Sequence, residues 1–118
     1  VTHIFAVEQR FAERLLDRSV TPLESIHADG LDAIFILGEQ ARALLKSYLA
    51  TATSDDLATI VDYPSKTAGI ILATKSTLAA NVFLHGIRHW GQVATVVRNA
   101  GFGDGWPHDY LLHQNITL

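Results

Sequence analysis

The chain has 118 residues, enough for one domain, and its 48% hydrophobic content predicts a real core rather than a disordered chain. A net charge of -3, with basic residues scattered among acidic ones, argues against a nucleic-acid partner because no basic face is formed. The chain has no cysteine, so any metal must be bound by histidine, carboxylate or water.

Neither a membrane span nor a signal peptide is evident. No apolar run approaches the roughly 18 to 20 residues that a span requires, and no charged segment followed by an apolar one opens the chain. Together with the lack of disulfides, this predicts a cytoplasmic protein with no membrane partner. The first residues already read as the interior of a helix and the chain lacks Met, so we expect an upstream segment to have been removed.

An amphipathic helix is predicted over residues 1–20, because Thr21 precedes Pro22 and is therefore biased away from helical geometry. Its apolar side consists of Ile4, Val7, Phe11 and Leu15. His3 lies along that side at the first turn. Alone, such a histidine is either a metal ligand or a core residue that is hydrogen-bonded within the protein.

A second long helix is predicted over residues 31–51, after a polar connection in which His27 is expected to be exposed. Its broad apolar face runs from Leu31 through Phe35 to Leu49. Residues 57–73 are predicted to form a loop, since Pro64 and Gly69 interrupt a short alternating pattern.

The third long helix, residues 78–101, carries the most informative pattern. Spacings of four and three predict an inward stripe that includes two histidines one turn apart, whose imidazoles can converge on one point. The stripe consists of Leu78, Val82, His85, His89, Gln92 and Val96. The histidines are either metal ligands or members of a hydrogen-bonded core cluster, and a third ligand would favour the metal. Gly101 marks the end of the helix, and beyond it Trp106, Tyr110 and Leu111 are expected to pack against the helices.

The complete pattern resembles the DinB-like (YfiT-like) family of metal-dependent four-helix bundles. His85-x-x-x-His89-Trp90-Gly91-Gln92 is similar to the family's H-x-x-x-H-R-G-Q motif, in its H-W-G-Q variant, and His3 matches the family's remaining ligand. Asn81 stands where some members carry a further histidine.

This resemblance implies an all-α, up-down-down-up four-helix bundle over residues 1–118, with the first helix missing from this chain. It also implies a divalent metal ion, zinc or nickel, bound by His3, His85 and His89. Three histidines leave one coordination position for water or substrate, as in catalytic sites. The family is commonly dimeric, and a bundle lacking a helix would expose an apolar groove, so a homodimer is expected.

Other polar residues receive lesser roles. Gln92 either hydrogen-bonds a ligand or a water, or caps a polar patch. Glu8, five residues after His3, is expected to point away from the ligand face. His108 and His113 lie in the tail, where a solvated histidine is the ordinary case.

Two classes of function follow. Characterised relatives suggest a thiol-dependent S-transferase, in which the metal activates a low-molecular-weight thiol for attack on an electrophile. The alternative is a non-enzymatic metal-binding or dimerisation module of stress-related function, because no base, nucleophile or thiol-binding motif is recognisable.

Overall fold

The computed structural model describes residues 1–65 and 67–102, which form helices and one β-hairpin. In chain order the elements are α1 (Thr2–Leu15), a 3₁₀ turn (Leu23–Ser25), α2 (Gly30–Thr51), α3 (Ser54–Ala58), β1 (Ile60–Ser65), β2 (Gly69–Thr74) and α4 (Lys75–Asn99). The three long helices lie where the sequence predicts them. Of Thr74, Ser76 and Thr77, the three residues that could cap α4 on sequence grounds, Thr74 is the cap, because its side chain accepts a hydrogen bond from the backbone N–H of Thr77.

The prediction of an all-α four-helix bundle is wrong, because residues 60–74 form an antiparallel two-stranded sheet rather than a loop. The strands pair from Ile60 opposite Thr74 to Ser65 opposite Gly69. Alternate residues of β1 are partly buried, and the ring of Tyr63 stacks on Phe11 of α1 with ring centroids 5.1 Å apart. This contact gives the short alternating pattern one buried face, which an isolated hairpin would lack.

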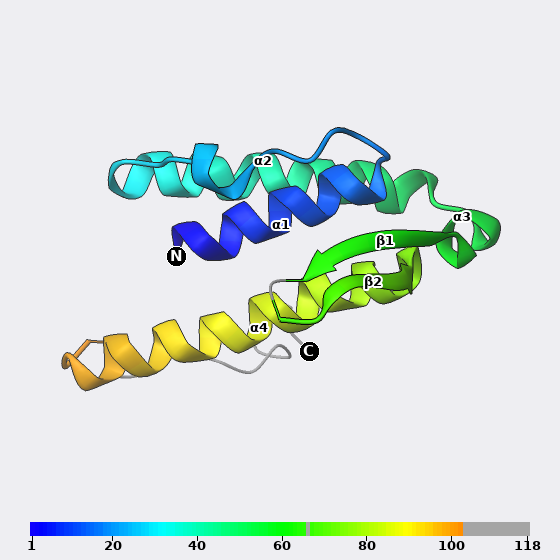
Figure 1. The fold of residues 1–118 in the computed structure, drawn as a ribbon. Coiled ribbons are helices and arrows are strands. Elements are labelled where there is room, and N and C mark those ends of the chain that lie inside the picture. Colours follow the sequence, from blue (N-terminus) through cyan, green and yellow to red (C-terminus); the bar gives the residue numbers. More distant parts are fainter. Residues whose placement is uncertain (66, 103–118) are drawn as a thin grey trace, which may run out of the picture.

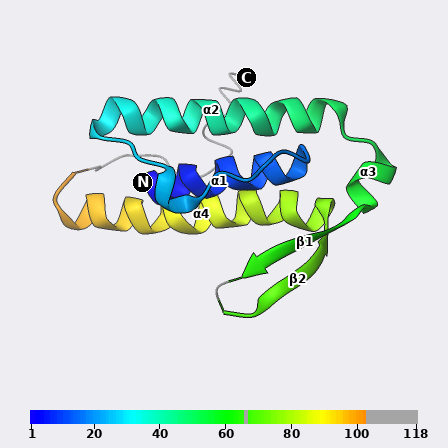
Figure 2. The same ribbon diagram turned by 45° about the horizontal axis from the view of Figure 1, so that its top comes forward.

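Helix α1 lies between α2 and α4 and packs against both (Figures 1 and 2). The hairpin lies at the end of the molecule where α4 begins, because β2 leads directly into that helix. One part of the core, around Phe11, Leu15, Leu45 and Val82, joins the three helices near the hairpin. A smaller part around Phe5 joins them near the N-terminus of α1.

Helix α1 ends earlier than residue 20. The chain turns at Asp17, whose φ of 55° places it in the left-handed region that Asp tolerates better than most residues. The buried carboxylate of Glu13 accepts hydrogen bonds from the backbone N–H and the hydroxyl of Thr21. The backbone N–H groups of Asp17 and Arg18 donate to the carbonyls of Arg14 and Glu13, which closes the helix locally, and the bonds to Thr21 hold the following segment against α1.

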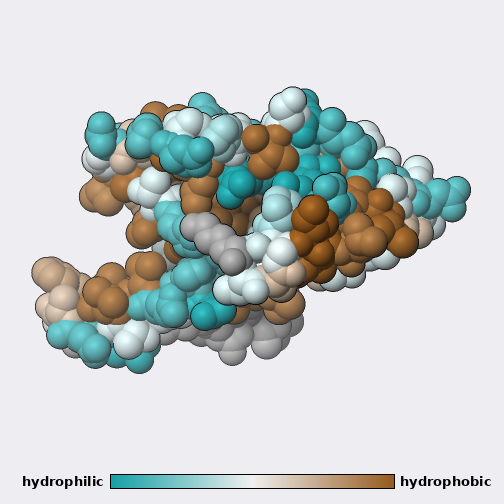
Figure 3. Space-filling view, in the orientation of Figure 1, coloured by the Kyte–Doolittle hydropathy of each residue, from teal (hydrophilic) through white to brown (hydrophobic). Residues whose placement is uncertain are grey.

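Several residues predicted to be buried are exposed. Leu31 is 70% exposed and Phe35 53% exposed on α2, and Val96 is 67% exposed on α4. Figure 3 shows hydrophobic surface along the C-terminal part of α4, which extends beyond the start of α1. The apolar stripes of α2 and α4 are therefore longer than the surface of α1 that can cover them.

A buried ion-pair cluster joins three elements near the hairpin. The side chain of Lys75 is 2% exposed, and its ammonium group lies 2.6 Å from Asp17 Oδ2 and 2.9 Å from Asp56 Oδ1. Burial alone would lower the pKa of Lys75, but the hydrogen bonds to both carboxylates raise it above its ordinary value. We call these three residues the lysine cluster.

The predictions for the C-terminal tail fall on residues that the structure does not describe. These predictions are the packing of Trp106, Tyr110 and Leu111 and the states of His108 and His113. Within residues 1–65 and 67–102, no helix is both long enough and apolar enough to cross a bilayer.

Candidate metal centre

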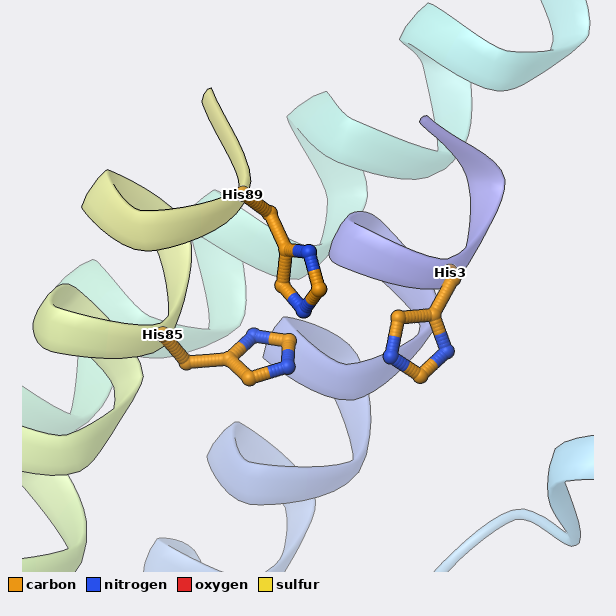
Figure 4. A group of neighbouring side chains, drawn as sticks. All are labelled: His3, His85 and His89. Carbon is orange, nitrogen blue, oxygen red and sulfur yellow. The ribbon is translucent and has the colours of Figure 1, made fainter. Parts of the chain in front are cut away.

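The structure brings together the three histidines proposed as ligands. His85 and His89 lie one turn apart on α4, with ring centroids 4.4 Å apart. The ring of His3, in the first turn of α1, lies 5.5 Å from that of His85 and 5.3 Å from that of His89. Figure 4 shows a nitrogen of each ring turned toward the space between them. We call these residues the histidine cluster.

The position of His3 depends on Phe5, which anchors the first turns of α1. Phe5 is 1% exposed, and its ring centroid lies 5.7 Å from that of Trp90 on α4. On its other side the ring lies against Gly38 of α2, where an added Cβ would be 2.8 Å from a ring carbon. Glycine at this position therefore allows the helices to approach closely and places His3 opposite His89.

The spacing of the histidine cluster suits a metal ion. One ring nitrogen from each histidine can be chosen so that all three lie within 4.8 Å of one another. In a tetrahedral zinc site, with bonds of about 2.0–2.1 Å, the ligand nitrogens are about 3.4 Å apart. About 1.4 Å of closure would be needed at most, which the exposed side chain of His3 can supply by rotation.

Gln92 supports one of these rings directly. Its Oε1 lies 2.7 Å from Nδ1 of His89 and accepts a hydrogen bond from it. This bond keeps the proton on Nδ1 and leaves Nε2 with a free lone pair, the tautomer that Nε2 ligation requires. Of the two roles left open for Gln92, the structure places it on a candidate ligand rather than on a separate polar patch.

The surroundings of His85 favour the neutral form that a metal ligand needs. Its pKa is lowered by burial and, to a smaller extent, by the nearby His89 and His3. Its Nδ1 is buried without a hydrogen-bond partner among the described residues.

The histidine cluster opens onto a hollow of about 370 Å³ between the start of α1 and the second half of α4. His3 is exposed rather than buried along its helix, because it lies at the end of α1. Val96, assigned from the sequence to the buried stripe, lines the hollow. The sequence could have indicated this position, because Val96 follows Gln92 by four residues and so lies one turn further along the same face of the helix.

Glu8 lies apart from the histidine cluster, as predicted, but it is not a surface residue. Its side chain is 12% exposed, and its Oε2 lies 3.9 Å from Nε of Arg42 on α2. Burial raises the pKa of its carboxyl group, an effect that Arg42 partly offsets. Its spacing from Ile4 and Phe11, four residues and three, already placed it on the buried side of α1.

Comparison of the chain with protein-family models, curated proteins and solved structures found no match. The resemblance to the DinB-like family therefore stays a prediction that depends on the residues quoted for it.

Proposed function

We propose that this chain binds one divalent metal ion through His3, His85 and His89, and that the ion is zinc or nickel. The observation that carries this proposal is the convergence of three imidazoles from two helices within 4.8 Å. An all-imidazole donor set suits zinc, nickel, iron and copper alike, and the family resemblance favours the first two. Gln92 would orient His89 in the bound state.

The chemistry proposed for this site is transfer of a small-molecule thiol to an electrophile. Three protein ligands leave a position open, and a metal ion there lowers the pKa of a bound thiol toward neutrality. The chain's own residues hold the site in one geometry: Phe5 fixes the start of α1, and Gln92 fixes the ring of His89. We propose a cytoplasmic location, where low-molecular-weight thiols are kept reduced.

The metal is tested first, by elemental analysis of protein purified without added metal or a histidine tag. We expect about one equivalent in wild type and almost none in His89→Ala. His27→Ala is the matched control, because His27 is exposed and lies outside the histidine cluster. Acidification below about pH 6 should release the metal, since imidazole must be neutral to coordinate. Full metal content in both His85→Ala and His89→Ala would overturn the proposal.

Catalysis is tested separately, with a panel of bacterial thiols such as mycothiol and bacillithiol against a haloarene or an epoxide at pH 7. We expect the metal-loaded wild type and His27→Ala to exceed the uncatalysed rate with at least one thiol. His89→Ala should not exceed it. Equal background rates for all proteins and all thiols would instead favour a non-enzymatic role.

That second candidate is a metal-binding or dimerisation module of stress-related function, and exposed apolar side chains favour it. Leu49, Phe83 and Ile87 line a hollow of about 330 Å³ between α2 and α4. Each of these side chains is at least 45% exposed. A second copy of the chain would remove this surface from water, so we propose a homodimer. Sedimentation equilibrium that detects only the monomer at micromolar concentrations would contradict it.

A further inference from the structure

The hollow beside the histidine cluster has two chemically different sides. His89 and Gln92 lie on its polar side. Its apolar side, which we call the valine wall, consists of Ile4, Val93, Val96 and Val97. A pocket of about 370 Å³ with an apolar lining and a few polar groups is typical of small-ligand sites, which range from roughly 300 to 1,000 Å³.

The valine wall is suited to an uncharged apolar group. Ile4 is buried and backs the wall, Val93 and Val97 are partly buried, and Val96 is 67% exposed. β-Branched side chains in a helix have one strongly preferred rotamer, so this surface needs little ordering when a ligand binds. In the described part of the chain, the ionisable groups that line the hollow are the imidazoles of His3 and His89 and the α-amino group of Val1. The side chains of the valine wall themselves offer neither a charge nor a hydrogen bond to a substituent that lies on them.

We propose that the valine wall binds the apolar body of a substrate whose reacting end lies at the histidine cluster. The substrate class is therefore a small molecule with a metal-binding or electrophilic head and a short, uncharged hydrocarbon body. This inference rests on the proposed metal site, and it concerns the second substrate rather than the thiol. Val96 is the specificity residue that this arrangement identifies, because it lies one turn after the polar Gln92.

The probes are straight-chain hydroxamic acids, whose heads bind metal ions while their tails vary in length. Affinities of acetohydroxamate, butyrohydroxamate and hexanohydroxamate for the zinc-loaded protein are measured by isothermal titration calorimetry. Each methylene in contact with the wall should lower Kd by about two- to fourfold. In Val96→Thr, which keeps the side-chain shape but adds a hydroxyl, hexanohydroxamate should bind about threefold or more weakly. Acetohydroxamate should be unaffected.

Leu84→Thr is the matched control. Leu84 lies on the same helix and is 65% exposed, but it lines neither of the two hollows. It should therefore keep the full dependence on chain length. Equal Kd values for the three hydroxamates, with zinc content and acetohydroxamate binding intact, would overturn the inference and leave the metal site standing. Equal losses in the two variants would also overturn it, whereas absence of zinc would refute the metal site and this inference together.

Discussion

The lysine cluster and the histidine cluster both join distant parts of the chain, but they differ in the chemistry of the side chains that they bring together. The buried ammonium group of Lys75 has two carboxylate partners, at 2.6 and 2.9 Å. The histidine cluster brings together three imidazoles from two helices, and in the described part of the chain the group includes no carboxylate. The buried Nδ1 of His85 has no hydrogen-bond partner among the described residues.

This difference separates a structural cluster from a candidate binding site. Opposite charges that pair at close range stabilise the fold without any ligand. Three imidazoles at close range carry ring nitrogens that can all coordinate one cation placed between them. The lysine cluster should therefore affect stability under all metal conditions, and the histidine cluster mainly when metal is present.

The largest expected effect is stabilisation by zinc. Free zinc at about one hundred times its Kd should raise the free energy of unfolding by about 2.7 kcal/mol, because it binds the folded chain preferentially. Thermal unfolding with zinc and with EDTA measures this effect. The double variant His85→Ala/His89→Ala should show no zinc-dependent rise in Tm, whereas His27→Ala should respond like wild type. An equal rise in the double variant would remove the distinction between the two clusters.

Replacing Lys75 with Met should lower the free energy of unfolding by about 2 kcal/mol, with or without zinc, because charge-assisted hydrogen bonds are lost while the aliphatic volume is kept. The cost stays moderate because Asp17, with a side chain 71% exposed, remains hydrated. Urea unfolding at pH 7 in EDTA measures it. Lys46→Met is the control, since Lys46 is exposed. If the free energy of unfolding of Lys75→Met equalled that of wild type, the cost of burying the Lys75 ammonium group would cancel the energy gained from its ion pairs.

Gln92→Leu should weaken zinc binding about tenfold, equivalent to about 1.4 kcal/mol, because His89 loses the acceptor that orients its ring. Competition with a chromophoric chelator measures the affinity. Since Gln92 is exposed, the unfolding curve in EDTA should hardly change. If the free energy of unfolding in EDTA fell by as much as the free energy of zinc binding, Gln92 would instead have a structural role.

The smallest effect concerns the pH dependence of the lysine cluster. Asp56 has a pKa below its ordinary value, chiefly because the Lys75 ammonium hydrogen-bonds its carboxylate. Its contribution is therefore present above the unfolded-state pKa of about 3.9 and is lost as the pH falls through the lowered folded-state value. Asp56→Asn should be less stable than wild type at pH 7, and the difference should shrink below about pH 4. Denaturant titrations across this range test it, and a difference that is constant with pH would contradict it.

Local sequence determined the three long helices and half of the candidate site. The spacing of His85 and His89 by four residues places both on one face of any helix, and Gln92 follows within reach of His89. The cap at Thr74 and the turn at Gly101, where φ is 83°, depend equally on neighbouring residues. These features could be predicted because helical geometry relates residues three and four positions apart, without any contribution from the rest of the fold.

Tertiary structure alone decided the remaining features. The hairpin exists where Tyr63 can stack on Phe11, more than fifty residues earlier, and no local pattern contains that contact. His3 lies beside His89 because α1 packs against α4, and the burial of Lys75 requires the two distant aspartates. Each of these depends on contacts between residues far apart in the chain. Hydrophobic periodicity identifies the side of a helix that can be covered, but only the packed neighbours determine how much of it is covered.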